Sequence, residues 1–496
     1  MSLARRVLSN TLIQIFGKAL TALMSVAIVK IITSYLGVEG YGAYTTVYEF
    51  LAFFSIAIDL GLFTIGVREM SKDETKIPLI LGNILSIRTI LGVLILGGSI
   101  LTAFLIPAYQ GTFIPLGVAI ATITTFLNII NGTLTTVLQV HLKMESSVYA
   151  LVIGKIISLI YMVWVILISF KDNSEAGFYQ LLIAGIIGNA VMLLITYFAT
   201  RKYTTIHFRF DWIFWREVVG KSLPYGIALI LNTIYFRLDV ILLSLMKDNM
   251  EVGIYGVALR MLEVLMIVPI FFMNAVLPIM TRFLREKNEK LITLWQYSFD
   301  FLFAIGLPIL VGTNLLARPI VKLISSEEFL SRPEAGFWGS DVALQILMFA
   351  LLLIFLNTLF SFTLVALEKQ AKLLWINLGC VFFKLAVSLA IIPSFGFRGA
   401  AVSSVLAEFF ILVFVFIIVH KHFKLRLKIS SILKISLSAG TMGAFIWLVH
   451  PLLLTILNSS AKAVLSTVLL GGTIYIIMLF AIKGISKDML KLVFKK

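Results

Sequence analysis

Long runs of apolar residues, separated by short polar segments, extend over the whole chain. Each run reaches the roughly 20 residues that an α-helix needs to cross the hydrocarbon layer of a bilayer. Charged residues, glycine and proline mark the breaks between the runs. The pattern predicts an all-α polytopic membrane protein with about fourteen transmembrane helices, at residues 8–33, 43–66, 79–106, 112–140, 148–170, 177–199, 221–246, 252–281, 291–324, 341–367, 371–393, 398–419, 431–456 and 461–482.

The ninth of these segments contains Pro308 and Pro319. Proline removes a backbone donor and its ring clashes with the preceding turn of a helix. We therefore expect residues 291–324 to be kinked or broken.

Basic residues predict the orientation of the chain. With the N-terminus placed in the cytoplasm, the segments on that side have about four times as many Lys and Arg residues as the segments on the other side. Cytoplasmic loops of membrane proteins show this excess. Both termini are therefore expected to be cytoplasmic, in a multi-pass protein of the cytoplasmic membrane. The same excess explains the net charge of +16 without a nucleic-acid partner.

Composition excludes several classes of protein. Hydrophobic residues make up 60% of the 496 residues and charged residues 13%, about half the charged share of a soluble protein. One cysteine, Cys380, and five histidines without a CxxC or HExxH motif predict neither disulfides nor a metal site. The longest external loop, residues 325–340, is too short for a catalytic domain. A transporter is therefore favoured over an enzyme.

A short motif occurs twice and indicates an internal repeat. Tyr41-Gly42 precedes Glu49 with the same spacing that separates Tyr255-Gly256 from Glu263, and both segments are predicted to run inward. Repeated halves are common in transporters. We predict an N-terminal lobe of helices 1–6 (residues 1–200), an amphipathic linker on the inner leaflet (201–220), a second lobe of helices 7–12 (221–420), and two further helices with a basic cytoplasmic tail (421–496).

Four stretches resemble one family. They are Tyr-Leu-Gly-Val-Glu-Gly-Tyr-Gly (35–42), Asp-Leu-Gly-Leu-Phe-Thr-Ile-Gly-Val-Arg-Glu-Met-Ser-Lys (59–72), Phe-Arg-Leu-Asp (236–239) followed by Val-Gly-Ile-Tyr-Gly-Val-Ala (252–258), and Gly-Phe-Arg-Gly-Ala-Ala (396–401) followed by Glu408. In this order they are similar to Wzx-type polysaccharide and oligosaccharide flippases of the multidrug/oligosaccharidyl-lipid/polysaccharide (MOP) exporter superfamily.

The resemblance implies a fold and an activity. Two six-helix lobes would enclose a central cavity that opens alternately to each side. The substrate would be a polyprenyl (pyro)phosphate carrying an oligosaccharide, moved across the bilayer without covalent chemistry or a cofactor. A glycan polymerase or transferase machinery would be a partner, and H⁺ or Na⁺ a coupling ion.

Charged residues inside the predicted helices are the candidate site, because an isolated charge at the bilayer centre costs about 2.5–3.5 kcal/mol on insertion scales. Arginine donates two parallel hydrogen bonds to phosphate. The candidates for contact with the anionic headgroup are Lys18, Arg88, Lys155, Arg237, Arg260 and Lys384. The candidate coupling or gating acids are Glu49, Asp59, Asp239, Glu263 and Asp300.

Internal ion pairs are the alternative explanation for these charges. It is strongest for Arg260 and Glu263, three residues apart on one helical face. Arg237 and Asp239 are two residues apart and point in different directions.

Other functions remain open. A multidrug or cation antiporter would favour a carboxylate-rich cavity, whereas acids and bases are about equally frequent here. A lipid II flippase is a second transport alternative. Short external loops disfavour a membrane polymerase or glycosyltransferase, and the intramembrane charges disfavour a structural scaffold.

Overall fold

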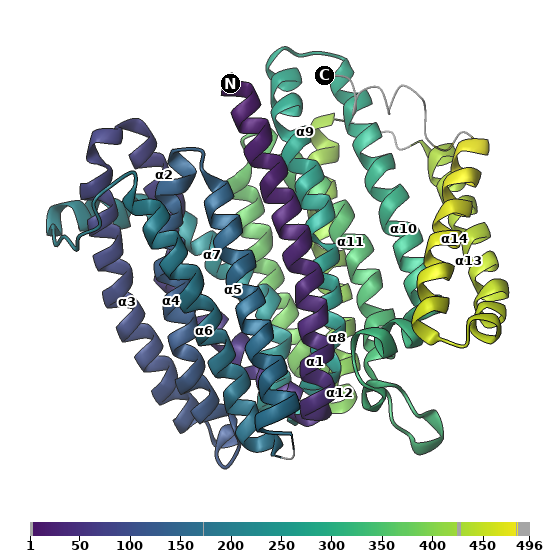
Figure 1. The fold of residues 1–496 in the computed structure, drawn as a ribbon. Helices are drawn as coiled ribbons and strands as arrows, with labels where there is room; N and C mark the ends of the chain where they lie inside the picture. Colours follow the sequence, from purple (N-terminus) through teal and green to yellow (C-terminus); the bar gives the residue numbers. More distant parts are fainter. Residues whose placement is uncertain (1–2, 172, 424–427, 483, 485–496) are drawn as a thin grey trace. The chain divides into compact units, whose positions relative to one another are not determined.

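A computed structural model describes residues 3–171, 173–423, 428–482 and 484. These residues are almost entirely helical, which confirms the all-α prediction (Figure 1). The predicted basic tail lies outside the described residues. The helices are α1 (Leu3–Asp59), α2 (Leu62–Lys72), α3 (Ile77–Leu105), α4 (Ile114–Val140), α5 (Met144–Trp164), α6 (Ser174–Arg201), α7 (Trp212–Met246), α8 (Asn249–Leu265), α9 (Ile267–Arg285), α10 (Lys290–Ile324), α11 (Ser340–Ala366), α12 (Gln370–Phe423), α13 (Ile429–Leu457) and α14 (Ser460–Ala481).

Twelve helical ranges among the described residues are long and apolar enough to cross a membrane. Two of these ranges, Phe16–Lys72 and Gln370–His422, have 57 and 53 residues, more than twice the roughly 20 residues that one crossing needs. Each contains one glycine outside the helical conformation: Gly37 with φ 66° and Gly396 with φ 53°. A positive φ favours glycine because a side chain would clash there. Both glycines are places where a long helix can turn back.

Contacts along α12 show that it is a hairpin. The hydroxyls of Ser388 and Ser403 are 2.6 Å apart, and the Cys380 thiol donates to the carbonyl of Ala407 at 3.5 Å. Residues progressively farther before Gly396 therefore meet residues progressively farther after it. The arms at 370–395 and 397–423 are antiparallel.

Helix α1 also reverses, at Gly37. In its first arm, Thr21 contacts Lys155 and Tyr35 donates to the Phe170 carbonyl, so this arm runs parallel to α5. In its second arm, Val47 packs at Gly117 near the start of α4. Further along, Met70 of α2 contacts Thr136 near the end of α4. The second arm therefore runs parallel to α4. Because a short turn joins α4 to α5, these two helices are antiparallel, and the second arm runs opposite to the first.

Dividing α1 and α12 at these glycines, and joining α2 and α9 to the helices before them, reproduces the fourteen predicted segments. The number of membrane crossings and the cytoplasmic termini stay predictions. Most boundaries lie within a few residues of those expected, and two differences are larger. Helix α7 begins at Trp212 rather than residue 221, because the Asp211 side chain accepts from the backbone N–H groups of Ile213 and Phe214. The predicted span 252–281 is interrupted at Met266.

Of the two outcomes expected for the ninth segment, a kink or a break, the break does not occur. Helix α10 continues through Pro308 and Pro319. Pro308 cannot donate to the carbonyl of Ala304, four residues earlier. The Tyr475 hydroxyl of α14 donates to that oxygen at 2.6 Å and replaces the missing hydrogen bond. Neighbouring helices commonly satisfy such carbonyls in membrane proteins.

The predicted linker, residues 201–220, has two parts. Its first part lies in a non-helical conformation against α3, where the backbone N–H of Arg209 donates to Ser86 at 3.1 Å and that of Asp211 to Asn83 at 2.9 Å. Its second part is the start of α7. Phe210 and Trp212 are 70% and 76% exposed. Contact of these aromatic side chains with the inner leaflet stays a prediction.

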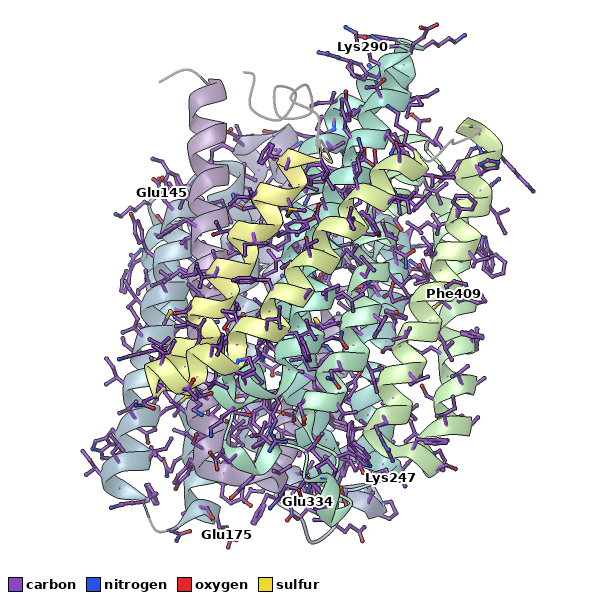
Figure 2. All side chains as sticks on the ribbon, turned by 90° about the vertical axis from the view of Figure 1, so that its right-hand side faces the viewer. Glu145, Glu175, Lys247, Lys290, Glu334 and Phe409 are labelled. Carbon is purple, nitrogen blue, oxygen red and sulfur yellow. The ribbon has the colours of Figure 1, made fainter. Side chains whose placement is uncertain are left out.

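Contacts divide the chain into two compact units, residues 1–253 and 254–496. In unit one, Glu145 and Glu175 lie at opposite ends, so α5 crosses the length of the unit (Figure 2). In unit two, Lys290 and Glu334 lie at opposite ends, so α10 does the same. Helices α13 and α14 pack on α10. The predicted lobe boundaries stay a prediction.

Two glycines allow a close backbone approach within unit one. A Cβ atom on Gly42 would overlap the carbonyl oxygen of Asn249, and one on Gly253 would overlap that of Val38. We expect Gly42→Ala to destabilise the protein by about 1–3 kcal/mol, the typical cost of overpacking. Thermal unfolding of the detergent-solubilised protein measures the effect. Gly98→Ala is the matched control, because nothing lies within 4 Å of its new methyl group. Equal midpoints for both variants would contradict the close approach.

Candidate functional site

Arg88 and Asp59 form an ion pair inside unit one. Arg88 of α3 is 3% exposed and also donates to the Thr133 hydroxyl of α4 at 3.0 Å. Its Nε atom has no hydrogen-bond partner. Asp59, at the end of α1, also accepts from the backbone N–H of Phe63 at 3.3 Å. The pair therefore ties three helices together, with the Asp59 side chain 29% exposed.

Arg237 and Glu49 form a second ion pair in unit one, between α7 and the second arm of α1. Their side chains are 25% and 12% exposed. Asp239, two residues further along α7, is 1% exposed. The two neighbours therefore have different surroundings, in agreement with the expectation that Arg237 and Asp239 point in different directions.

Lys155 joins α5 to the first arm of α1. Its ammonium group donates to the Thr21 carbonyl at 3.0 Å and the Ser25 hydroxyl at 2.7 Å. Lys18, almost one helical turn before Thr21, is exposed. These two candidate cations therefore lie on neighbouring parts of one helix pair.

In unit two, Arg260 and Glu263 of α8 form an ion pair of 2.7 Å. Their side chains are 48% and 25% exposed. The pairing expected from their spacing is confirmed. Glu49 and Glu263 correspond in the predicted repeat but differ in their partners. Glu49 pairs with an arginine of another helix, α7, whereas Glu263 pairs with an arginine of its own helix, α8.

Lys384 belongs to a buried polar cluster between α11 and the two arms of α12. Lys384 is 2% exposed and Glu408 is 4% exposed, and both act electrostatically on the Cys380 thiol. Asn357 of α11 donates to the Glu408 carboxylate at 2.6 Å and to its backbone carbonyl at 2.8 Å. We call Asn357, Cys380, Lys384 and Glu408 the hairpin polar cluster.

Asp300 connects α10 to α13. It is 6% exposed and accepts from the Gln296 amide at 2.7 Å, and Ser431 and Lys428 at the start of α13 act on it electrostatically. Asp300 is therefore a buried carboxylate with a neutral donor on its own helix and a lysine near it on the neighbouring element. The described residues contain no group of three or more His, Cys, Asp or Glu side chains that could hold a metal ion.

The neutral side chains that bind these charged residues were not predicted from the sequence. Thr133, Asn357 and Gln296 each hydrogen-bond to a candidate charge or to Glu408. Asn357 interrupts a strongly apolar run, which is a visible signal of a polar contact inside a helix bundle. The charged candidates themselves, six bases and five acids, stay predictions as substrate, coupling or gating residues.

A family model described as "Polysaccharide biosynthesis protein" matches residues 7–284, more than half of the chain. The chain belongs to this family. A second model, MatE, matches residues 224–390. A search of curated proteins found no sequence that matches this chain.

Solved structures show the fold of this family member. "Lipid II flippase MurJ, inward closed conformation" aligns with a TM-score of 0.73 and 13% identity, covering 95% of this chain and 98% of that chain. An inward-facing multidrug resistance MATE family transporter of the MOP superfamily aligns with a TM-score of 0.63 and 17% identity, covering 80% and 94%. An outward-facing one aligns with a TM-score of 0.57 and 16% identity, covering 83% and 94%. The two family models together with this fold confirm the predicted MOP superfamily membership, and the chain is a multi-pass membrane protein.

Proposed function

We propose that this protein is a flippase that moves a polyprenyl-(pyro)phosphate-linked oligosaccharide across the cytoplasmic membrane by alternating access, for the assembly of a surface polysaccharide or glycan. The observation that carries the proposal is the polysaccharide biosynthesis family match over residues 7–284. A fold similar to a lipid II flippase over 95% of the chain supports a lipid-linked substrate. A glycan polymerase or transferase machinery would use the product.

The ion pairs suggest how such a headgroup is bound. Arg237 and Arg260 are partly exposed and each holds a carboxylate. A phosphate offers the guanidinium fork a geometry and charge similar to those of a carboxylate. We propose that substrate phosphate displaces Glu49 from Arg237 and Glu263 from Arg260, so that H⁺ or Na⁺ can bind the released acids. No covalent step is needed.

Neutralising these arginines tests the proposal. We expect Arg237→Gln and Arg260→Gln to lower transport by about tenfold or more, because each removes a charge-assisted hydrogen bond worth about 1.5–3 kcal/mol. Restoration of surface glycan in a flippase-deficient strain and flipping of a lipid-linked oligosaccharide in proteoliposomes are the measurements. Lys462→Gln is the control, since Lys462 is exposed at the start of α14.

The alternatives give different results in the same assays. Full activity of both arginine variants, at parental protein levels, would contradict the headgroup role. Export of cationic dyes without lipid flipping would identify a multidrug antiporter. Rescue of lipid II transport, with no effect on surface glycan, would identify a lipid II flippase.

A further inference from the structure

An open apolar groove lies between the two arms of α12, near the end opposite the Gly396 turn. Its volume is about 320 Å³. Phe410 forms its floor, stacked on Phe383 at 4.9 Å and tilted against Phe414 at 4.6 Å. Among the described residues it is lined by Lys372, Trp375, Ile376, Gly379, Phe410, Phe414 and Ile418, and we call this surface the α12 groove.

A groove of this composition does not hold water well. A water molecule needs two to four polar partners, and Lys372 is the one charged residue in the lining. If the groove were empty, the side chains that line it would lack dispersion contacts on their open side. In a bilayer, the hydrocarbon chain of a lipid is available to occupy the groove. Phe409, 56% exposed, projects from the same arm about midway along it (Figure 2).

The groove has a polar end and an apolar end. Lys372 lies in the first turn of α12, and Gly379 lies two turns deeper, about 10 Å away along the helix. Trp375, 69% exposed, lies between them and suits the boundary between headgroups and hydrocarbon. This order of cation, aromatic ring and apolar floor matches the order of phosphate, glycerol region and acyl chain in a phospholipid.

The polar end is basic. Lys369 contacts His422 across the open end of the hairpin, and Lys421 is exposed beside it. Glu368 is an exposed carboxylate in the same turn. The described residues 368–372 and 420–423 together contain three lysines, two histidines and this one acid. Basic pockets between transmembrane helices select anionic lipid headgroups.

We propose that the α12 groove is a binding site for an anionic glycerophospholipid of the bilayer, with an acyl chain between the two arms and the phosphate at Lys372. This lipid is distinct from the proposed transport substrate. It would fill the lipid-facing side of the hairpin whose inner side contains the hairpin polar cluster. Charge complementarity and the fit of an apolar groove beneath a basic end carry the assignment.

Two variants and two matched controls test the site. Lys372→Gln removes the headgroup cation, and Gly379→Leu fills the groove. The new Cβ at Gly379 would make only ordinary contacts with Phe410, at 3.8 Å and 3.9 Å, so the backbone tolerates it. Lys290→Gln removes an exposed lysine at the start of α10, the end that lies near the start of α12 because Trp295 of α10 hydrogen-bonds with Thr363 at the end of α11. Gly440→Leu adds the same bulk at an exposed glycine with nothing within 4 Å.

Native mass spectrometry of the purified full chain measures retained lipid, with phosphatidylglycerol and phosphatidylcholine of identical acyl chains as probes. We expect phosphatidylglycerol to be retained in preference to phosphatidylcholine. Lys372→Gln should weaken its retention about fivefold, the effect of one lysine near a membrane surface. Gly379→Leu should abolish retention of this lipid. Both controls should bind as the parent does.

Three results would overturn the proposal. Equal retention of the two lipids would show that the groove does not select anionic headgroups. Parental binding by Gly379→Leu, at an unchanged elution volume, would place the lipid elsewhere. Displacement of phosphatidylglycerol by equimolar polyprenyl phosphate would assign the groove to the transport substrate. Because binding is measured without transport, failure here leaves the proposed flippase activity to its own test.

Discussion

Arg88→Met is expected to destabilise the protein by about 3 kcal/mol or more. Removal of one member of a buried ion pair typically costs this much, because the partner is left uncompensated. Here the partner is Asp59, and the change also removes the hydrogen bond to Thr133, so contacts among α1, α3 and α4 are lost together. Thermal and denaturant unfolding in nanodiscs should show the loss as a lower midpoint.

The double variant Arg88→Met with Asp59→Asn separates charge from packing. It removes both charges, so we expect it to recover part of the stability, with a coupling energy above about 1 kcal/mol in the double-mutant cycle. Recovery of stability without recovery of transport would show that Arg88 also contacts the substrate. Parental stability of the single variant would contradict a stabilising pair.

Glu408→Leu is the second change with a large expected effect. It leaves the Asn357 amide without its carboxylate acceptor and removes the negative charge from the surroundings of Lys384, which is 2% exposed. A buried polar group without a partner costs about 1–3 kcal/mol, and an uncompensated charge costs more. We expect a loss of at least about 3 kcal/mol, measured as the unfolding midpoint and as the yield of monodisperse protein.

Glu408→Gln is the informative control for this cluster. It keeps an oxygen that can accept from Asn357 while removing the charge. If the charge near Lys384 dominates, Glu408→Gln should be nearly as damaging as Glu408→Leu, and the added change Lys384→Met should rescue both. A Glu408→Gln variant as stable as the parent would assign the role of Glu408 to hydrogen bonding alone.

Sequence patterns predicted the helices well because each apolar run is long and its ends are charged. The same patterns could not predict that α10 continues through Pro308, since the hydroxyl that satisfies Ala304 comes from Tyr475, far along the chain. They placed a break between residues 33 and 43 and another near 396, but the tightness of these turns became visible only from the backbone angles of Gly37 and Gly396.

The contacts of the candidate charged residues also differ in whether the sequence could predict them. The pair Arg260 and Glu263 was predictable because three residues separate them on one helix. Arg237 and Glu49 are far apart in the chain, so their pairing depends on how α7 packs against α1. Lys155 uses a backbone carbonyl and a serine, partners that no charge pattern reveals.

The reversals at Gly37 and Gly396 also affect how the topology can be mapped. Epitope insertion, protease cleavage and cysteine labelling all need several residues of chain in water, whereas each reversal has one glycine outside the helical conformation. A survey with such reagents would detect neither turn, and would find the accessible segments before and after each hairpin on one side of the membrane with no crossing between them. It would still place the next accessible segment correctly, because two missed passes return the chain to the side from which it started.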